Sequence, residues 1–167
     1  LRNKLKGFAP ESIDMIWRSG VFRWIVVEAD GAAGKPVKAP AVHEPVIPQS
    51  TKWVIGIIGL EAVGQPLTER WAFRPQLVSK ITGLALGAAI TESALAEVLM
   101  NANGIMKGFP VQAKRFAFLN QAESQERLAA GRRIAKMINS HKTAGFSGVL
   151  IGQTIYEPFV REYYPAD

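Results

Sequence analysis

Three short apolar runs, at residues 53–59, 115–119 and 148–151, constrain the fold of this chain more than any other feature. They are rich in β-branched and aromatic residues, and their apolar side chains follow one another without the alternation of a half-exposed strand. Such runs are typical of parallel strands that are covered on both faces. A fourth run of this kind, at residues 21–27, directly follows a short helix that we predict at residues 10–19.

The segments between these runs show the apolar periodicity of helices. We predict helices at residues 74–81, at residues 92–100 with Thr91 as the N-cap, and at residues 124–141. Strands that alternate with helices indicate a mainly parallel sheet with right-handed crossovers. The sequence therefore predicts one α/β domain over residues 1–167, with three α/β/α layers.

Composition limits the chemistry that this chain can perform. Its 167 residues include no cysteine, which excludes disulfides, thiolate metal sites and thiol nucleophiles. The net charge of +6 is spread along the chain, so we expect no nucleic acid as a partner. No apolar segment is long enough for a signal peptide or a membrane span, and we expect a cytoplasmic protein without a membrane partner. The first residue is Leu1 rather than methionine, so we expect a fragment of a longer protein.

The segment at residues 28–50 fits no regular element, and irregular segments of this length are usually functional or disordered. Glu28 and Asp30 begin it, directly after the run at residues 21–27. Residues two apart on an extended chain project to the same side, so we expect both carboxylates to converge at the carboxyl end of a strand. Ligands of open parallel sheets bind at this edge.

Carboxylates in this position typically hold Mg²⁺ or orient an attacking water beside the phosphates of a nucleotide. Gly31 lets the backbone approach a phosphate closely, and Lys35 and Lys38 can reach phosphate oxygens. The alternative is a turn that carries two solvated acids.

Asn120 and Glu123 follow the run at residues 115–119 in the same way. An amide can donate to and accept from a purine edge, and a carboxylate can accept N–H groups from guanine. The spacing is similar to the Asn-Lys-x-Asp motif of GTP-binding proteins. Alternatively, Glu123 or Ser124 caps the next helix.

Two further residues are candidates for chemistry. His43, beside Glu44, is either a general base or metal ligand, or a loop histidine bound to backbone. Arg74 pairs with a phosphate or with a loop carboxylate, or it forms a salt bridge at the start of a helix.

A series of short motifs resembles the YqeC family of selenium-dependent hydroxylase accessory proteins. The similarity runs from about Phe8 to the last predicted strand. Its most specific part is Glu-Ala-Asp-Gly at residues 28–31 together with His-Glu-Pro-Val-Ile-Pro at residues 43–48. The other matching motifs lie at residues 35–40, 59–64, 74–75, 82–83 and 119–120.

The resemblance implies a P-loop NTPase-like fold, allied to metallochaperone-type GTPases. It implies Mg²⁺ and GTP or ATP as cofactors, and a role in the maturation of molybdenum hydroxylases of the xanthine dehydrogenase type. The implied partners are a purine nucleotide and the molybdenum hydroxylase or its maturation proteins. Family members carry a Gly-Gly-Lys-Thr-type phosphate loop, and no Gly-x-x-x-x-Gly-Lys-Ser/Thr pattern occurs in this sequence. We therefore expect an incomplete P-loop NTPase-like domain with little or no turnover by itself.

By position, the resemblance assigns Glu28, Asp30 and Gly31 to the acidic motif, His43 and Glu44 to the loop motif, and Asn120 to base recognition. It implies that Asp30 or Glu28 holds Mg²⁺ and helps to position the attacking water. Lys35 or Lys38 would then offset phosphate charge.

Three positions depart from the family pattern. Gln121 stands where lysine is usual and Glu123 replaces an aspartate, which weakens the expectation of guanine specificity. Phe73 stands where a histidine commonly precedes Arg-Pro, which removes a candidate ligand. Two alternatives to a nucleoside triphosphatase remain open: a non-catalytic interaction module with a degenerate nucleotide pocket, and a metal or selenium carrier that uses His43, Glu44 and Asp30.

Overall fold

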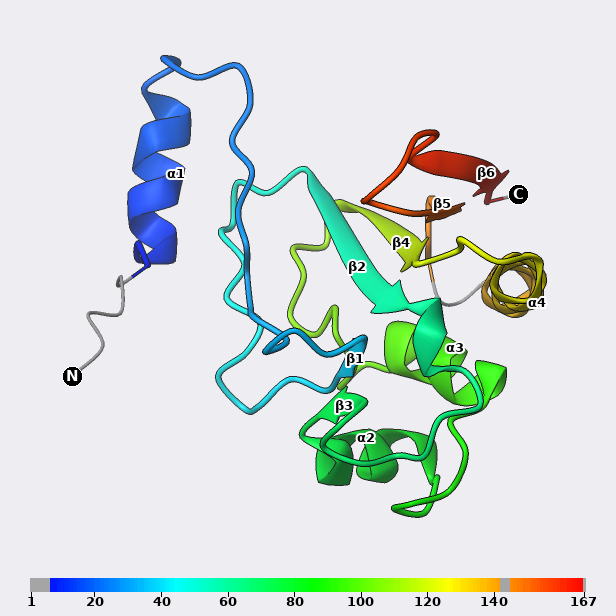
Figure 1. The fold of residues 1–167 in the computed structure, drawn as a ribbon. Helices are drawn as coiled ribbons and strands as arrows, with labels where there is room; N and C mark the ends of the chain where they lie inside the picture. Colours follow the sequence, from blue (N-terminus) through cyan, green and yellow to red (C-terminus); the bar gives the residue numbers. More distant parts are fainter. Residues whose placement is uncertain (1–6, 142–144, 167) are drawn as a thin grey trace.

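The computed structural model describes residues 7–141 and 145–166, and its main sheet has the strand order β2-β4-β5-β6. The strands are β2 (Trp53–Gly59), β4 (Lys114–Asn120), β5 (Gly148–Gly152) and β6 (Val160–Pro165). The first three are parallel, and β6 is antiparallel to β5 (Figure 1). The α/β class and the mainly parallel sheet are thus confirmed. The strand β6 was not predicted, because charged residues interrupt its apolar pattern.

The helices between the strands also follow the sequence pattern. They are α2 (Pro75–Thr82), α3 (Glu92–Met100) and α4 (Gln125–Ser140), and a 3₁₀ turn, η1 (Leu60–Ala62), follows β2. The side chains of Thr91 and Ser124 accept hydrogen bonds from the first turns of α3 and α4, which confirms both as N-caps. The helix α2 begins one residue later than predicted, because Arg74 has a φ of 61°, outside the helical range.

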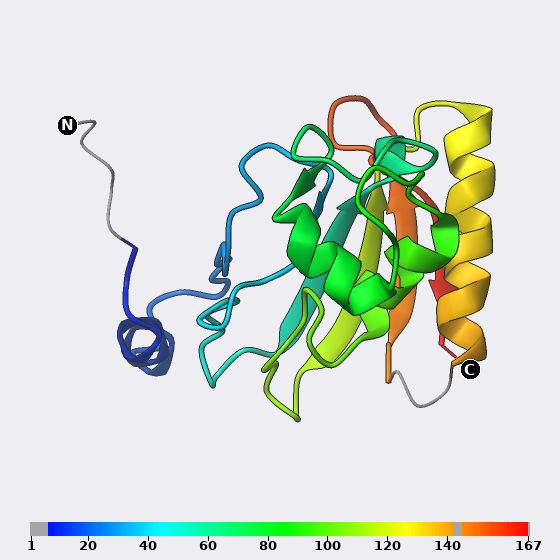
Figure 2. The ribbon, with the colours of Figure 1, turned by 90° about the horizontal axis from the view of Figure 1, so that it is seen from below.

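The described helices α2, α3 and α4 cover one face of the main sheet (Figure 2). Ile58, Leu119 and Ile151 point into this side and are fully buried. On the opposite face, Ile55 and Ile57 remain 52% and 59% exposed. The described residues thus form two layers rather than the three that were predicted. The strands are apolar on both faces, but these helices bury only one.

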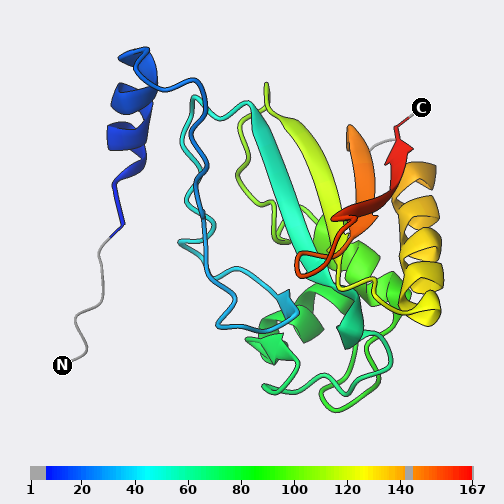
Figure 3. The ribbon, with the colours of Figure 1, turned by 45° about the horizontal axis from the view of Figure 1, so that its top comes forward.

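The prediction of a strand at residues 21–27 is wrong for the described structure. This segment is extended but belongs to no sheet, and most of it is exposed. The preceding helix, α1 (Pro10–Arg18), agrees with the prediction but stands apart from the other helices, beyond this segment (Figure 1). Trp24 contacts Trp53 at the start of β2, with 5.8 Å between ring centroids, and the segment runs alongside β2 (Figure 3). An apolar run predicts an extended backbone, but a strand also needs a partner.

Two short strands lie outside the main sheet and position the site. β1 (Val37–Lys38) and β3 (Ala72–Phe73) pair in parallel, with Lys38 opposite Phe73. The backbone N–H of Gly59, at the carboxyl end of β2, donates a hydrogen bond of 2.8 Å to the carbonyl of Pro36. The irregular segment is thereby attached to the carboxyl edge of the main sheet.

Within residues 7–141 and 145–166, no helix combines the length and the apolar character that crossing a bilayer requires.

Candidate functional site

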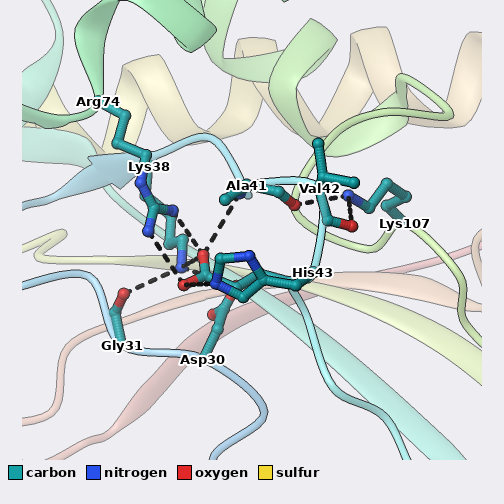
Figure 4. Close-up of polar contacts among 9 residues, drawn as sticks. Asp30, Gly31, Lys38, Ala41, Val42, His43, Arg74 and Lys107 are labelled. Atoms are coloured by element: carbon teal, nitrogen blue, oxygen red, sulfur yellow. Dashed lines mark hydrogen bonds and ion pairs between the residues drawn. The ribbon is translucent and has the colours of Figure 1, made fainter.

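Four charged side chains converge beside the carboxyl edge of the main sheet: Asp30, Lys38, Glu44 and Arg74, which we call the charged cluster (Figure 4). The Lys38 Nζ atom lies 2.8 Å from Asp30 Oδ2 and 3.0 Å from Glu44 Oε2. It also donates a hydrogen bond of 2.9 Å to the carbonyl of Gly31. The Lys38 side chain is only 6% exposed, so these oxygens compensate for the loss of water around its charge.

Arg74 completes the charged cluster by binding the same carboxylate, Glu44. Its two terminal nitrogens donate to the two carboxylate oxygens of Glu44, with 3.0 Å between Nη2 and Oε1. These hydrogen bonds, and a smaller contribution from Lys38, hold the pKa of Glu44 well below its ordinary value of 4.5 and outweigh the opposing effect of burial. The same hydrogen bonds raise the pKa of Arg74. Glu44 therefore stays ionised in neutral solution.

Local structure explains how the two cations meet. Lys38 lies opposite Phe73 in the β1–β3 pair, and Arg74 follows Phe73 directly. The left-handed backbone of Arg74 turns the chain sharply before Pro75 begins α2. The ring of Phe73 lies beneath both cations, with its centroid 4.4 Å from the Arg74 guanidinium carbon and 5.8 Å from Lys38 Nζ. Phe73 is thus part of the site, although the sequence marked it only as a lost ligand.

Lys107 holds the loop that presents Glu44. Its Nζ atom donates hydrogen bonds of 2.7 Å and 3.1 Å to the carbonyls of Ala41 and Val42 (Figure 4). These contacts fix the turn directly before His43 and Glu44. Sequence reasoning missed Lys107, because it lies 66 residues from Ala41 and belongs to no motif.

The two predicted acidic residues have different surroundings. Asp30 belongs to the charged cluster, whereas Glu28 is exposed, with its Oε1 atom close to Gly31. Among the contacts that the structure describes, Glu28 makes no ion pair. The convergence of both carboxylates at the end of a paired strand is therefore not observed, because the strand itself does not form.

His43 and Lys35 lie at the margin of the site. The His43 side chain is 79% exposed, and its Nε2 atom is 3.8 Å from Glu44 Oε1. Lys35 is half-buried after a turn at Ala33 and Gly34. Neither side chain has its position fixed as tightly as that of Lys38.

Asn120 is the last residue of β4, and its amide nitrogen lies 3.4 Å from the hydroxyl of Thr154. The Asn120 Oδ1 and Gln121 Oε1 atoms are both buried, and no described residue donates a hydrogen bond to either. Because buried acceptors are normally paired, these two oxygens mark a place where a ligand can donate. Gln121 also has a left-handed backbone, with a φ of 64°.

Glu123 does not join Asn120. It forms an ion pair of 3.0 Å with Arg127, and it lines a groove of about 640 Å³ between η1 and α4. Ser124 caps α4, as the alternative reading of this segment predicted.

Backbone contacts connect the charged cluster to Asn120. Gly59 bonds to Pro36, two residues before Lys38, and Gly59 is the register partner of Asn120. Both parts of the site thus lie at the carboxyl edge of parallel strands, where ligands of such sheets bind.

The residues present fit Mg²⁺ only in its phosphate-bound form. In the described ranges, no group of three or more His, Cys, Asp or Glu side chains is arranged to hold a metal ion. Mg²⁺ commonly takes one or two carboxylates together with phosphate oxygens and waters. Asp30 Oδ2 is buried and accepts no hydrogen bond from any described residue, although Lys38 Nζ is close. A cation at this oxygen would therefore take the place of the Lys38 ammonium, which lies 2.8 Å away.

Comparisons with known proteins point to one family. A family model described as YqeC protein matches residues 1–76. Over 140 residues the chain is 31% identical to the "Uncharacterized protein YqeC" of Escherichia coli (strain K12), a match that covers 84% of the chain and 55% of that relative. No solved structure matches the chain. The chain thus spans about half the length of the curated relative it matches, and what the comparisons show is similarity to the YqeC family.

Proposed function

We propose that the charged cluster and Asn120 form two sides of a purine nucleotide site in a longer polypeptide with a P-loop NTPase-like fold. The observation that carries this proposal is the meeting of two cations and two carboxylates at the carboxyl edge of a mainly parallel sheet. The role implied by the resemblance is the maturation of selenium-dependent molybdenum hydroxylases. GTP or ATP is the ligand, and the hydroxylase or its maturation proteins are the partners.

Each residue has a role that its chemistry allows. Lys38 and Arg74 bind phosphate oxygens, and the guanidinium can do so with two parallel hydrogen bonds. Asp30 holds Mg²⁺, and Glu28 acts on it through water. Asn120 Oδ1 accepts an N–H group of the base. Bound Mg²⁺ supplies charge neutralisation at the phosphates.

We expect residues 1–167 alone to show little turnover. Catalysis of phosphoryl transfer depends on positioning and on donors around the β- and γ-phosphates. The sequence contains no Gly-x-x-x-x-Gly-Lys-Ser/Thr loop that would provide them.

A second candidate is a non-catalytic interaction module, favoured by one specific observation. Glu44 already neutralises Lys38 and Arg74 through hydrogen bonds to both. Such an arrangement is what a pocket without a phosphate ligand would retain. The irregular loop would then serve to bind the partner enzyme.

Calorimetric titration separates the two candidates. GTP–Mg²⁺ and ATP–Mg²⁺ are titrated into residues 1–167 and into the whole gene product that contains them, and again after Asp30→Asn. We expect Mg²⁺-dependent binding to the whole product to weaken by about tenfold or more in the variant. Glu69→Gln, at an exposed position outside the cluster, is the matched control.

Absence of binding of both nucleotides to the whole product would rule out the nucleotide site and leave the interaction module. Unchanged binding after Asp30→Asn would rule out the role of Asp30 alone.

A further inference from the structure

Donors from separate parts of the chain surround the carboxylate of Glu44. Both terminal nitrogens of Arg74 donate to its two oxygens, with 3.0 Å between Nη2 and Oε1. The Lys38 Nζ atom lies 3.0 Å from Oε2, and the backbone N–H of Ala41 donates to the same oxygen over 3.4 Å. An arginine fork binds phosphate with the same paired geometry. Glu44 thus uses the donors that a phosphate group needs.

The charges of the cluster decide whether it can accept a second anion. Lys38 and Arg74 supply two positive charges. Asp30 and Glu44 supply two negative charges, so the cluster is neutral overall. Without Glu44, two positive charges and one negative charge would leave a net charge of +1. Both carboxylate side chains are only 18% exposed, so a phosphate beside an ionised Glu44 would meet strong repulsion. Phosphate and Glu44 therefore compete for the same cations.

The two cations have further partners that hold them in place. Lys38 Nζ lies 2.8 Å from Asp30 Oδ2 and donates a hydrogen bond of 2.9 Å to the carbonyl of Gly31. The Arg74 guanidinium carbon lies 4.4 Å from the centroid of the Phe73 ring. Neither set of contacts involves Glu44. The cations are thus prepared for an anion that replaces it.

Residues 40–45, which carry Glu44, form a short loop between two fixed ends. At one end, the backbone N–H of Ala39 donates a hydrogen bond of 3.4 Å to the carbonyl of Phe73. At the other end, the N–H of Val46 donates over 3.1 Å to the carbonyl of Ala29. The loop can therefore move while the segments on either side of it stay attached.

Two side chains attach this loop to the rest of the protein. Among the hydrogen bonds that the structure describes, those that leave residues 40–45 involve the Glu44 carboxylate or Lys107, which donates to the carbonyls of Ala41 and Val42 (Figure 4). The side chains at the tip, Val42 and His43, are 97% and 79% exposed. A segment with so few attachments opens at a low cost in free energy.

We propose that Glu44 is an internal anion that closes the charged cluster, and that a phosphate group of the ligand displaces it together with residues 40–45. This displacement rests on the proposed function, which assigns Lys38 and Arg74 to phosphate oxygens. It makes ligand binding and release of the loop two parts of one equilibrium. The apparent affinity for phosphate then depends on the fraction of molecules in which the loop is open.

Calorimetric titration with magnesium-free pyrophosphate tests the competition between the two anions. In residues 1–167 and in the whole gene product, Glu44→Gln should bind pyrophosphate at least about tenfold more tightly than the wild type, because a neutral amide does not repel it. Glu69→Gln removes the same charge at an exposed position and is the control for general electrostatics. Its affinity should stay within about twofold of the wild type.

Lys107→Met separates release of the loop from electrostatics. The substitution removes a positive charge, so long-range attraction alone would make pyrophosphate bind more weakly. Because Lys107 holds the loop, its loss should instead strengthen binding by about threefold or more. The donors of the charged cluster remain intact in this variant. Lys52→Met, at an exposed position, should bind no more tightly than the wild type.

Amide hydrogen exchange reports on the loop in the unmodified chain. The N–H groups of Ala41 and Glu44 bond to acceptors within the closed loop. When pyrophosphate is bound, both should exchange at least about fivefold faster. The N–H of Val46, at the fixed end, should exchange as before.

Three results would overturn the proposal: Glu44→Gln that binds pyrophosphate no better than the wild type or not at all, weaker binding by Lys107→Met, or unchanged exchange in the loop when pyrophosphate is bound. If circular dichroism shows that Glu44→Gln is unfolded, the other two measurements still decide. Pyrophosphate carries no base and the titrations contain no Mg²⁺. Failure of the whole gene product to bind purine nucleotides would therefore refute the proposed function without changing any of these outcomes.

Discussion

Glu44 accepts hydrogen bonds from both terminal nitrogens of Arg74, a residue 30 positions further along the chain. The same carboxylate also accepts a hydrogen bond from Lys38. One loop residue thus joins β1, the start of α2 and the irregular segment. Its removal should affect both stability and anion binding.

Glu44→Gln should lower the free energy of unfolding by about 2 kcal/mol at neutral pH, the usual value for hydrogen bonds to a charged group. Because the folded state lowers the pKa of Glu44 from 4.5, its stabilising contribution is fully present above that value. The contribution is lost as the pH falls towards the pKa of the folded state. The difference between wild type and variant should therefore be constant near neutrality and shrink in acid.

Urea unfolding at a series of pH values measures this difference. Glu69→Gln is the control, since its side chain is exposed and its removal should change little. A difference that grows as the pH falls would contradict the assignment.

Lys38→Met should cost about 3 kcal/mol of stability. The substitution keeps an apolar side chain of similar length but leaves Asp30 and Glu44 partly buried without their shared cation. Chemical denaturation measures the loss, with Lys52→Met at an exposed position as the control. Equal stability of the two variants would show that the charge of Lys38 is not compensated as the geometry implies.

Ile57→Lys tests whether the open face of the sheet is covered in the whole gene product. In residues 1–167 the side chain is 59% exposed, so we expect a change within about 0.5 kcal/mol. In the whole product, a cost of at least about 2 kcal/mol would show that this face is buried there. Thermal unfolding of both proteins gives the comparison. Val111→Lys, at a position that is 93% exposed, should be tolerated in both.

Gly59→Ala should destabilise the carboxyl edge of the sheet by about 2 kcal/mol, as overpacking does elsewhere. A Cβ atom at this position would lie 1.9 Å from Gln121 Oε1 and 2.6 Å from the Cβ atom of Pro36. Adding Gln121→Gly should restore part of the loss, because it removes the nearest contact and suits the left-handed backbone. Differential scanning calorimetry measures both effects. Gly7→Ala, which meets no atom within 4 Å, is the neutral reference.

Local signals predicted most of the regular structure. The bounds of β2 and α3, and the caps at Thr91 and Ser124, follow from side-chain periodicity and hydroxyl placement, which act over a few residues. The segment at residues 21–27 shows what such local signals do not predict. Its apolar pattern predicts an extended backbone correctly, but strand formation also requires a neighbour that periodicity does not specify.

The charged cluster was predicted only in part for a similar reason. Asp30, Lys38 and Arg74 were each identified as binding residues, and a loop carboxylate was one expected partner of Arg74. Their meeting around Glu44 depends on the β1–β3 pair, whose strands of two residues are too short to carry any periodic signal. The contact of Lys107 with the loop is equally non-local. Residue types therefore indicated which side chains could bind a ligand, whereas tertiary pairing determined which of these side chains lie together.

In the proposed nucleotide site, the unpaired oxygens of Asn120 and Gln121 would favour groups that donate hydrogen bonds. Both are acceptors, and they belong to successive residues at the end of β4. A molecule that offers amino or imino hydrogens would satisfy them. One that presents a carbonyl at the same place would bury acceptor against acceptor, so discrimination here would arise from rejection of the wrong group rather than from attraction of the right one.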